Sequence, residues 1–548
     1  MLDTAVTADP NRVVLSRKTD TGWRDASYRD FTEQVRSVAC GLLAHGVRHG
    51  DRVAVLGRTS YEWAVADYAA MAIGAVTVPI YPTSSEHQVK HVLADSGAAW
   101  FFAETPEDAR RLTAAGATAV WLLREVHEWR VTDRKDELDA RWHAVKADDL
   151  ATIVYTSGTT GLPKGCMLTH RNMYVSSANT VEQTGWMLRD ATPGQGQAST
   201  LLSLPLSHVF GRTILLSCLC GGTRTGLVPG VPELLEALAE FRPTWLPLVP
   251  YALEKIRKRS RGLLDADAEE TAIAAGLANA GQAVELPEFA AVRESFGGRF
   301  RYVISGGASL DDTTAAFYAG IGVTILNCYG LTEAATAVTV NEPATNRMST
   351  VGRPIPGVTI AIAEDGELLI KGGNVSPGYW PERTAGEWLA TGDLGEIDAD
   401  GFLRITGRRK EILVTSGGKN VAPTPLEDRV RLHPLVSNCV VIGDGRSYVT
   451  ALVTLDAAAL PGWAARNGVD LDDDGWREHP ALLEEVGTAV DDANTLVSRA
   501  ESIRRFRILP GDLTVADGLM TPSMKVRRAA VAEVFAEDIA ALYDISAK

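Results

Sequence analysis

The chain has 548 residues, more than a single domain usually contains, and hydrophobic residues make up 45% of it. Charged residues make up only 22%, a composition that excludes a largely disordered protein. Asp and Glu total 69 against 54 for Lys and Arg, and the net charge of −15 argues against nucleic acid and anionic membranes as partners. An anionic ligand therefore needs a locally positive site.

Targeting and membrane signals are not evident. The first residues lack the basic region and apolar run of a secretory signal. The apolar segment 68–80 is shorter than a membrane-spanning helix, and segment 201–220 is interrupted by His208 and Arg212. The six cysteines are scattered, which favours buried reduced thiols over a zinc site. We therefore expect no integral membrane segment and a cytoplasmic location.

In chain order, the first elements alternate between helix and strand. The pattern predicts a helix over 31–44, a buried strand over 52–56, a helix over 61–73 and a strand over 76–79. Such alternation is typical of parallel sheets covered by helices. Further along, we expect a loop at 193–196 and surface helices in the Ala-rich, acidic segment 263–294.

The strongest local signal is segment 153–165, where a strand-like run opens into a loop of small residues. The loop consists of Thr156, Ser157, Gly158, Thr159, Thr160 and the residues up to Lys164. Glycines let backbone N–H groups approach an anion, hydroxyls donate hydrogen bonds, and the lysine adds charge. This chemistry predicts a triphosphate site. Pro163 and Gly165 do not fit the P-loop pattern, and composition alone also allows a plain linker.

The texture of the sequence changes after Gly407. Residues 449–453 are strand-like, and apolar residues recur at helical spacing from Leu482 to Ile503. The charged segment 408–411 suits an exposed hinge. We therefore predict an α/β protein whose large N-terminal domain, residues 1–407, has parallel and mixed sheets layered with helices. A small C-terminal α/β domain, residues 412–548, follows the hinge.

Five further segments join the loop in the order found in one enzyme superfamily. They are Ser305–Ala308, Tyr329–Glu333, Thr391–Leu394, Gly407–Glu411 and Met520–Lys525. With the loop they resemble the acyl-adenylate-forming superfamily of acyl-CoA synthetases, luciferases and peptide-synthetase adenylation domains. The similarity spans nearly the whole chain. Within the superfamily, segments 401–407, 416–423 and 521–528 look like AMP-forming bacterial long-chain acyl-CoA synthetases.

This resemblance implies a binding site for the nucleoside of ATP. Tyr329 would stack on the adenine ring, and Asp393 would accept both ribose hydroxyls with Arg408 supporting the same sugar. A buried core tyrosine and a solvated turn are the alternative readings of Tyr329 and of the Asp393 segment. The remaining nucleotide-binding positions implied are Gly306, Gly307, Ala308, Asn327 and Gly330.

The resemblance also implies the groups that act on the phosphates. Thr332 would bond the α-phosphate, and Glu333 would hold Mg²⁺, joined by Thr156, because hard oxygen ligands suit that ion. Lys525 would be the main catalytic residue. The attacking carboxylate and the α-phosphate are both negative, so a fixed cation between them lowers the barrier. Taken alone, Lys525 would read as an exposed lysine of a basic cluster.

A second conformation follows from the resemblance. The mobile C-terminal domain would turn about Lys410, withdraw Lys525 and bring the loop Gly417, Gly418 and Lys419 to the pantetheine tunnel of coenzyme A. Two glycines suit a narrow thiol channel, whereas a plain hairpin turn is the alternative. ATP, Mg²⁺ and coenzyme A are thus the expected cofactor and co-substrates.

The acyl site is the least defined part of the sequence. His208 is a candidate gate near the carboxylate, with a structural histidine as the alternative. Residues 245–251 would line or back the acyl group, although core packing explains most such positions. Gly211 stands where long-chain relatives usually carry a larger acidic residue, Cys328 replaces a common glycine, and the region after Leu253 is shorter than usual. A cyclic or aromatic acid therefore stays open.

The expected reaction is activation of a medium-chain, long-chain or bulky apolar carboxylic acid to acyl-AMP, followed by transfer to coenzyme A. A carrier-protein phosphopantetheine is the second acceptor, but the compact stretch 357–392 lacks the insertion that adenylate-only ligases often carry. A luciferase-like oxygenase and a non-catalytic binding protein are the other classes, and the intact motif residues disfavour the latter. The sequence leaves a homodimer open.

Overall fold

A computed structural model describes residues 1–129, 134–156, 162–189, 196–260, 264, 266–383, 386–471, 475–521 and 525–544. These residues form six β-sheets with helices packed on them, which confirms the predicted α/β class. The helices of the first 320 residues are α1 (Leu2–Ala8), α2 (Tyr28–Ala44), α3 (Tyr61–Ala72), α4 (Glu86–Ser96), α5 (Pro106–Ala114), α6 (Lys135–Ala144), α7 (His170–Thr184), α8 (Trp186–Arg189), α9 (Val209–Gly221), α10 (Val231–Phe241), α11 (Pro250–Ser260), α12 (Ala266–Ala278), α13 (Ala290–Ser295) and α14 (Asp312–Gly320). Among the described residues no helix is long and apolar enough to cross a bilayer.

A six-stranded sheet contains the strands predicted near the N-terminus. Its order is β6 (Val120–Leu122), β5 (Trp100–Ala103), β3 (Arg52–Leu56), β4 (Val76–Ile80), β7 (Leu150–Thr156) and β8 (Lys164–Thr169). The pairs from β6 to β7 are parallel, and β8 returns antiparallel to β7. This confirms the strands predicted at 52–56 and 76–79, which are β3 and β4, and the helices predicted at 31–44 and 61–73, which are α2 and α3. The same sheet contains β7 and β8, the strands on either side of the predicted phosphate loop.

Two further sheets complete the first part of the chain. One has the order β2 (Gly22–Ser27), β1 (Val13–Thr19), β10 (Arg224–Leu227) and β9 (Ser199–Leu202). The other has the order β11 (Trp245–Leu248), β12 (Tyr302–Ser305), β13 (Thr324–Leu331), β14 (Thr336–Val340) and β15 (Arg353–Pro354). Strands β11, β12 and β13 are parallel, so the segments that follow β12 and that end β13 meet at one edge. Of the expected loop 193–196, only Gly196 lies within the described residues.

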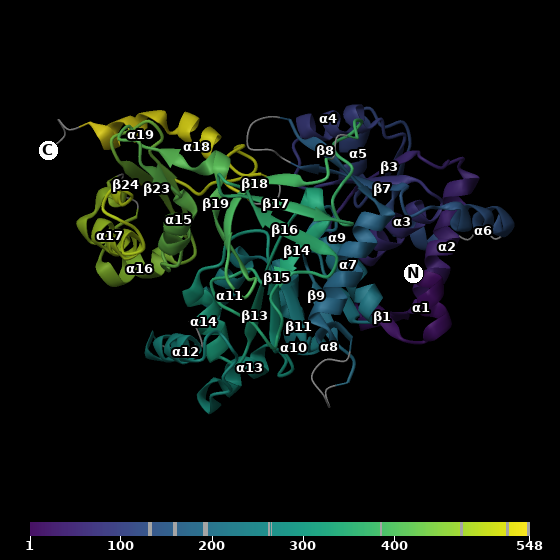
Figure 1. Ribbon diagram of the computed structural model, residues 1–548, viewed down its shortest axis with the longest axis horizontal. Helices are drawn as coiled ribbons and strands as arrows, with labels where there is room; N and C mark the ends of the chain where they lie inside the picture. The colour runs from purple at the N-terminus through teal and green to yellow at the C-terminus, as the bar shows by residue number, and fades with distance from the viewer. Residues whose placement is uncertain are drawn as a thin grey trace.

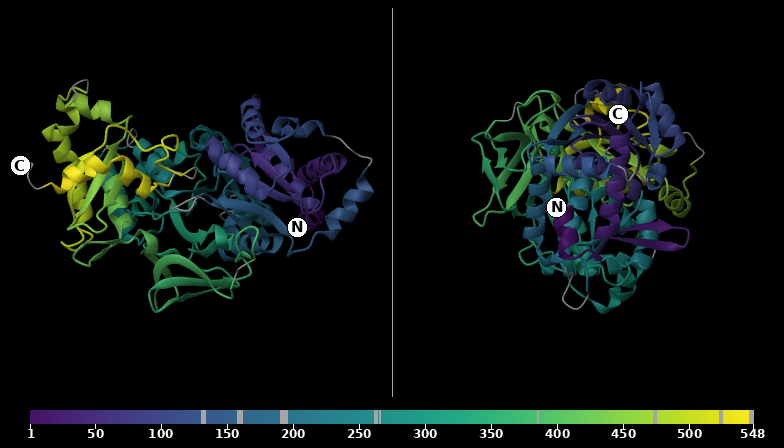
Figure 2. Two further views of the ribbon diagram at one scale, coloured as in Figure 1. Left: turned by 90° about the horizontal axis from the view of Figure 1, so that it is seen from above. Right: turned by 90° about the vertical axis from the view of Figure 1, so that its right-hand side faces the viewer.

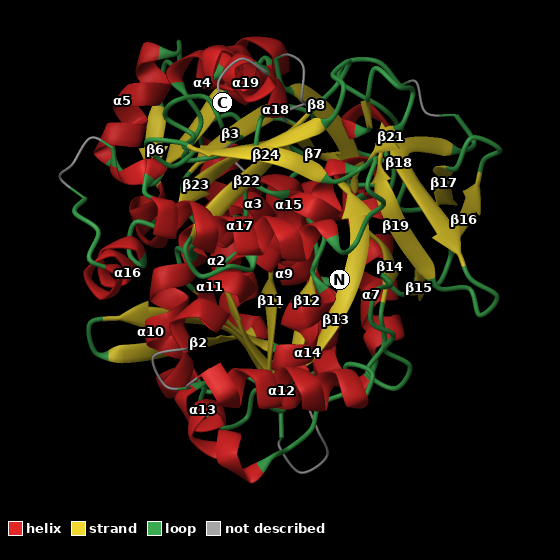
Figure 3. Ribbon diagram, turned by 90° about the vertical axis from the view of Figure 1, so that its left-hand side faces the viewer, coloured by secondary structure: helices red, strands yellow, loops and turns green. Residues whose placement is uncertain are grey.

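Along the chain, an antiparallel sheet lies between this part and the C-terminal elements. Its strands are β16 (Val358–Ile362), β17 (Glu367–Gly372), β18 (Leu389–Ile397) and β19 (Leu403–Arg408). It extends to the right in Figure 3. Strand β19 ends at Arg408, so the sheet leads the chain directly into the predicted hinge.

The C-terminal elements gather at one end of the long axis, on the left of Figure 1 and of the left view in Figure 2. They are the hairpin β20 (Leu413–Val414) and β21 (Asn420–Val421), the sheet β22 (Val436–Ile442), β23 (Val449–Leu455) and β24 (Ile503–Ile508), and helices α15 (Pro423–Arg431), α16 (Leu460–Asn467), α17 (Pro480–Asn494), α18 (Arg528–Val534) and α19 (Ala536–Tyr543). Strand β23 confirms the predicted strand at 449–453. The helical periodicity up to Ile503 was wrong beyond Asn494, because Val497 follows the helix and Ile503 starts β24. Two hydrophobic cores in this region contain only residues from Leu413 onward.

A buried ion pair ties several N-terminal elements together. Arg212 in α9 contacts Asp67 in α3 at 2.7 Å, and both side chains are almost fully buried. The guanidinium also donates to Thr152 of β7 at 2.6 Å and Thr77 of β4 at 3.0 Å. Because breaking such a pair would leave an uncompensated buried charge, it holds α9 in register with the six-stranded sheet.

The segment expected to form surface helices is more deeply integrated than predicted. Helix α12 approaches α14 so closely that a Cβ on Gly276 would lie 1.9 Å from the Ala316 carbonyl oxygen. Glu269 of α12 is buried and pairs with Arg257 of α11 at 2.7 Å. The burial of Glu269 could not be predicted from the acidic composition of the segment, because Arg257, which neutralises it, lies on another helix.

Candidate functional site

The predicted phosphate segment lies on the hairpin of β7 and β8. Thr156 at the end of β7 pairs in register with Lys164 at the start of β8. The Lys164 side chain is exposed, as a residue that receives an anion must be. Ser157, Gly158, Thr159 and Thr160 lie outside the described residues, so their part in binding stays a prediction.

Glu333 lies beside this hairpin, in the short 3₁₀ helix η3 (Thr332–Ala334). The hydroxyl of Tyr379 donates a hydrogen bond to Oε1 of Glu333. The ammonium nitrogen of Lys164 lies 5.9 Å from the centre of the Tyr379 ring. The structure thus brings Lys164 and Glu333 to opposite parts of one tyrosine. Sequence reasoning missed Tyr379, because no spacing rule marks an isolated Gly-Tyr-Trp turn.

The predicted adenine segments meet at the edge of the sheet of β11–β15. A Cβ on Gly306 would lie 2.5 Å from the Cys328 sulfur, and a Cβ on Gly330 would lie 1.4 Å from the Thr336 carbonyl oxygen. Gly307 has a φ of +88°, in the region that favours glycine. Cys328, noted as a departure from the family, therefore fills the space behind Gly306. Ala308 follows this turn, and the Asn327 carbonyl accepts from the Asn341 amide at 3.0 Å.

The predicted ribose site is a compact polar cluster. Asp393 in β18 pairs in register with Arg408 in β19, and Arg408 Nε lies 3.4 Å from Asp393 Oδ1. The Tyr329 hydroxyl donates to Asp393 Oδ2 at 2.6 Å. Burial, followed by the charge of Asp393, raises the pKa of the Tyr329 phenol, so it stays a neutral donor. The structure places the three residues together, while their roles toward a nucleotide stay predictions.

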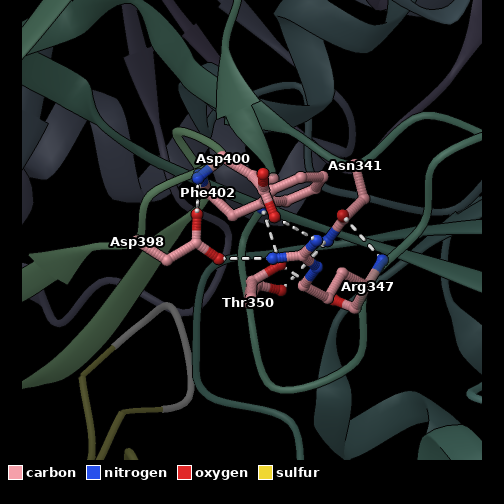
Figure 4. Close-up of polar contacts among 7 residues, drawn as sticks. Asn341, Arg347, Thr350, Asp398, Asp400 and Phe402 are labelled. Carbon is pink, nitrogen blue, oxygen red and sulfur yellow. Dashed lines mark hydrogen bonds and ion pairs between the residues drawn. The ribbon is translucent and has the colours of Figure 1, made fainter.

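The far end of the β18–β19 hairpin is anchored by Arg347 (Figure 4). Its guanidinium contacts Asp398 at 2.5 Å and Asp400 at 2.8 Å, and lies 4.3 Å from the centre of the Phe402 ring. The Arg347 backbone N–H donates to the Asn341 side chain at 3.2 Å. Because Asn341 also bonds Asn327, this anchor links the hairpin that carries Asp393 to the adenine strand. It was not predicted, because its members are about fifty residues apart in the chain.

Lys525 lies within electrostatic range of this site. The structure couples Lys525 to Asp393, Glu411 and Glu333, each of which raises its pKa. Loss of solvent and then the charge of Arg408 outweigh them and lower the pKa of Lys525, although the residue is exposed at the surface. The predicted catalytic cation thus shares one region with the predicted ribose and metal residues.

The predicted hinge segment forms a short 3₁₀ helix, η4 (Arg409–Glu411), in which Lys410 is exposed. Arg409 contacts Asp365 at 2.5 Å and Glu367 at 3.1 Å, which fixes the N-terminal end of the segment to the antiparallel sheet. Beyond it, the loop 417–419 is an exposed hairpin turn, and Lys419 contacts Glu501 at 3.4 Å. In this arrangement the charges of the predicted site residues Asp393 and Glu333 act on Lys525, whereas the 417–419 loop contacts C-terminal residues.

His208 is the N-cap of α9, where its Nδ1 accepts from the Phe210 amide at 3.0 Å. Burial, followed by the charge of Lys525, lowers the pKa of His208 to about 4, so the ring is neutral at pH 7. The helix cap supports the alternative that His208 is a structural histidine, and its role as a gate stays a prediction. Gly211 has no room for a side chain, because a Cβ there would lie 2.4 Å from the Pro205 carbonyl oxygen.

Most of the predicted acyl-pocket residues belong to the core. Trp245, Leu246 and Leu248 are fully buried in hydrophobic clusters. Val249 lies 3.8 Å from where a Cβ of Gly307 would stand, and Tyr251 is exposed. This segment therefore backs the site more than it lines it.

The donor set near Glu333 fits the expected Mg²⁺. Glu333 offers carboxylate oxygens, and Thr156 offers a hydroxyl on the neighbouring hairpin. Within the described ranges, no group of three or more His, Cys, Asp or Glu could hold a metal by itself. Mg²⁺ is usually held by one or two carboxylates together with substrate phosphates, so a metal that arrives with the nucleotide suits these residues.

Comparisons with known proteins cover the same span. Residues 2–380 match the family model described as AMP-binding enzyme, and residues 410–547 match that of the AMP-binding enzyme C-terminal domain. A long-chain-fatty-acid–CoA ligase of Mycobacterium tuberculosis, FadD15, is 41% identical over 581 aligned residues, with 98% of this chain and 95% of the relative covered.

Solved structures agree in fold. The o-succinylbenzoate CoA synthetase MenE of Bacillus subtilis, in complex with the acyl-adenylate intermediate OSB-AMP, superposes with a TM-score of 0.73 at 21% identity and 97% coverage of both chains. The same synthetase with ATP and a magnesium ion gives a TM-score of 0.70 at 21% identity, covering 96% of this chain and 98% of that one.

Proposed function

The chain belongs to the AMP-binding enzyme family, and we propose that it is an AMP-forming acyl-CoA ligase whose acid substrate is a long-chain fatty acid. The observation that carries the proposal is the polar cluster of Tyr329, Asp393 and Arg408, which brings three expected nucleotide residues together. The charges of Asp393 and Glu333 also act on Lys525. The name of the relative that is 41% identical supports the choice of acid and of coenzyme A.

The first half-reaction joins two anions. A carboxylate oxygen of the acid attacks the α-phosphorus of ATP, and the bond from that phosphorus to the pyrophosphate oxygen breaks. Lys525 and Lys164 supply positive charge to the phosphate oxygens as pyrophosphate leaves, which lowers the barrier. Mg²⁺, when bound through Glu333, would neutralise further phosphate charge.

The second half-reaction needs a different arrangement. The sulfur of coenzyme A attacks the acyl carbonyl carbon, AMP leaves with the bonding electron pair, and the thiol proton passes to solvent. The turn of residues 408–411 would withdraw Lys525 and present Gly417, Gly418 and Lys419 to the thiol. The division into domains 1–407 and 412–548, a cytoplasmic location and a homodimer stay predictions within this proposal.

The decisive experiment incubates the protein with ATP, Mg²⁺ and coenzyme A over a panel of fatty and aromatic acids, and measures AMP release. We expect release to require both an acid and coenzyme A and to be fastest with long-chain acids. Lys525→Ala should slow acid-dependent pyrophosphate exchange roughly 100–1000-fold, by analogy with lost oxyanion donors.

Three outcomes would correct or overturn the proposal. If acyl-AMP accumulates and no thioester forms, the acceptor would be a carrier-protein phosphopantetheine instead of coenzyme A. A preference for aromatic acids would replace the substrate class, and the absence of exchange with every acid would overturn the activity itself.

A further inference from the structure

Residues 373–380, here named the Tyr379 segment, bridge two elements of the phosphate site. On one side the segment is tied to η3. The fully buried Asn374 donates to the carbonyls of Ala334 at 3.1 Å and Ala337 at 2.9 Å, and the Ser376 amide donates to the Glu333 carbonyl at 2.8 Å. These bonds fix the backbone of the segment relative to the backbone that carries Glu333.

On its other side the segment pairs with β8. The Met167 amide donates to the Gly378 carbonyl at 3.0 Å, and the Trp380 amide donates to the Gly165 carbonyl at 2.7 Å. The Trp380 indole N–H also donates to the Asp95 carbonyl at 3.0 Å. The Tyr379 segment is therefore held like an extra strand beside Lys164.

The Tyr379 side chain contacts both functional groups. Its hydroxyl bonds one carboxylate oxygen of Glu333, and its ring lies 5.9 Å from the Lys164 ammonium. Tyr379 is 37% exposed, so its phenol is not needed to complete a hydrophobic core. Its placement instead corresponds to the partners that orient metal ligands in protein sites.

We propose that Tyr379 is a positioning residue that holds the Glu333 carboxylate so that its free oxygen faces the Mg²⁺ of bound MgATP, with Lys164 kept at the adjacent phosphates. The inference rests on the proposed function. A carboxylate has two oxygens, and fixing one of them by a phenol leaves the other oriented for the metal. If the hydrogen bond from Tyr379 to Glu333 served only to stabilise the fold, its loss would leave the metal affinity unchanged.

The test measures metal affinity directly, apart from catalysis. Mn²⁺ replaces Mg²⁺, and its binding to the protein with α,β-methylene-ATP, an analogue that cannot release pyrophosphate, is titrated by electron paramagnetic resonance. Tyr379→Phe removes only the hydroxyl and should weaken Mn²⁺ binding about tenfold, the lower range for lost partners of metal ligands. Tyr174→Phe, a change at an exposed tyrosine of α7, should leave binding unchanged.

A double-mutant cycle supplies a second readout. Glu333→Gln should weaken Mn²⁺ binding, and adding Tyr379→Phe to it should have no further effect if the phenol acts through that carboxylate. Unchanged Mn²⁺ affinity in Tyr379→Phe, or additive losses in the double variant, would overturn the inference. Absence of acid-dependent pyrophosphate exchange in the unaltered protein would instead count against the proposed function, so the two failures are distinguishable.

Discussion

At the scale of single residues, Arg408 has two electrostatic partners of opposite sign. It pairs with Asp393 at 3.4 Å and lowers the pKa of Lys525. In the proposed mechanism Lys525 must carry its proton to stabilise negative phosphate oxygens. Arg408, which contacts the Asp393 carboxylate, would then also limit the pH range of catalysis. The pH dependence of the first half-reaction therefore reports on this pair.

The value of kcat/KM for pyrophosphate exchange should fall as pH rises through the lowered pKa of Lys525, because deprotonation removes the cation. Burial and then Arg408 lower that pKa. Arg408→Gln removes the second cause, so the pKa rises and the alkaline limb should move to higher pH, together with any loss in binding. Arg409→Gln, which alters a residue paired with Asp365 and Glu367, is the matched control and should not move the limb. An unmoved limb in Arg408→Gln would contradict the assignment of Lys525.

Individual positions differ in how far the sequence could define them. Gly330 could be predicted only as a motif residue, and the structure supplies its reason, since a Cβ would meet the Thr336 carbonyl. The contacts of Tyr379 with Glu333 and of Arg212 with Asp67 join residues 46 and 145 positions apart. Spacing rules describe neighbours on one helix or strand, so they cannot reveal such pairs.

At the scale of elements, α15 docks the C-terminal part onto the N-terminal part. Asp428 accepts a hydrogen bond from the Ser309 hydroxyl, next to the adenine segment. Arg429 donates to Thr313 at 2.6 Å, and Arg431 lies 3.6 Å from Glu254. Burial raises the pKa of Asp428 to about 7, against the lowering effect of Arg431. In this docked orientation the charges of Asp393 and Glu333 act on Lys525.

Arg429→Glu should weaken this docking. Arg429 now lies 3.6 Å from Asp311, so a glutamate at position 429 would put two negative charges next to each other. We expect acyl-AMP formation to fall roughly tenfold, equivalent to about 1.4 kcal/mol. Thioester formation from chemically prepared acyl-AMP should be unaffected, since it needs the other orientation. Asp492→Ala removes the C-terminal partner of Arg429 and should change neither rate. Equal losses in both half-reactions would argue for a general folding defect instead.

Elements with a clear hydrophobic period were predicted correctly, and failures occurred where contacts decide the outcome. Strand β4 is buried along its whole length, so its apolar run was sufficient. Helix α17 ends at Asn494, although the apolar spacing continues to Ile503, because the Asn494 side chain bonds both backbone groups of Ile503 and turns the chain into β24. The hydrogen bonds of the Asn494 side chain thus accompany the end of α17, whereas the apolar spacing alone predicted a longer helix.

At the scale of the whole molecule, the described residues after the predicted hinge form hydrophobic cores of their own. The cores from Leu413 onward contain no residue of the preceding part among those described. The segment 409–411 leads into these cores as a short 3₁₀ turn, and the contact of Arg409 with Asp365 fixes its start. After the turn, the backbone N–H of Ile412 donates a hydrogen bond to the Arg408 carbonyl at 3.2 Å. We therefore expect that a rotation about the backbone of 409–411 would leave these cores intact.

Lys410→Pro should restrict that rotation, because proline fixes φ near −65° and removes a backbone N–H. In the orientation described here the charges of Asp393 and Glu333 already act on Lys525, so acyl-AMP formation should stay close to that of the unaltered protein. Thioester formation should slow by at least about tenfold, equivalent to about 1.4 kcal/mol on its barrier. Single-turnover measurements of each half-reaction separate the two rates. Lys410→Ala keeps the backbone free and should retain both, so a proline variant that loses both rates equally would refute a hinge at this residue.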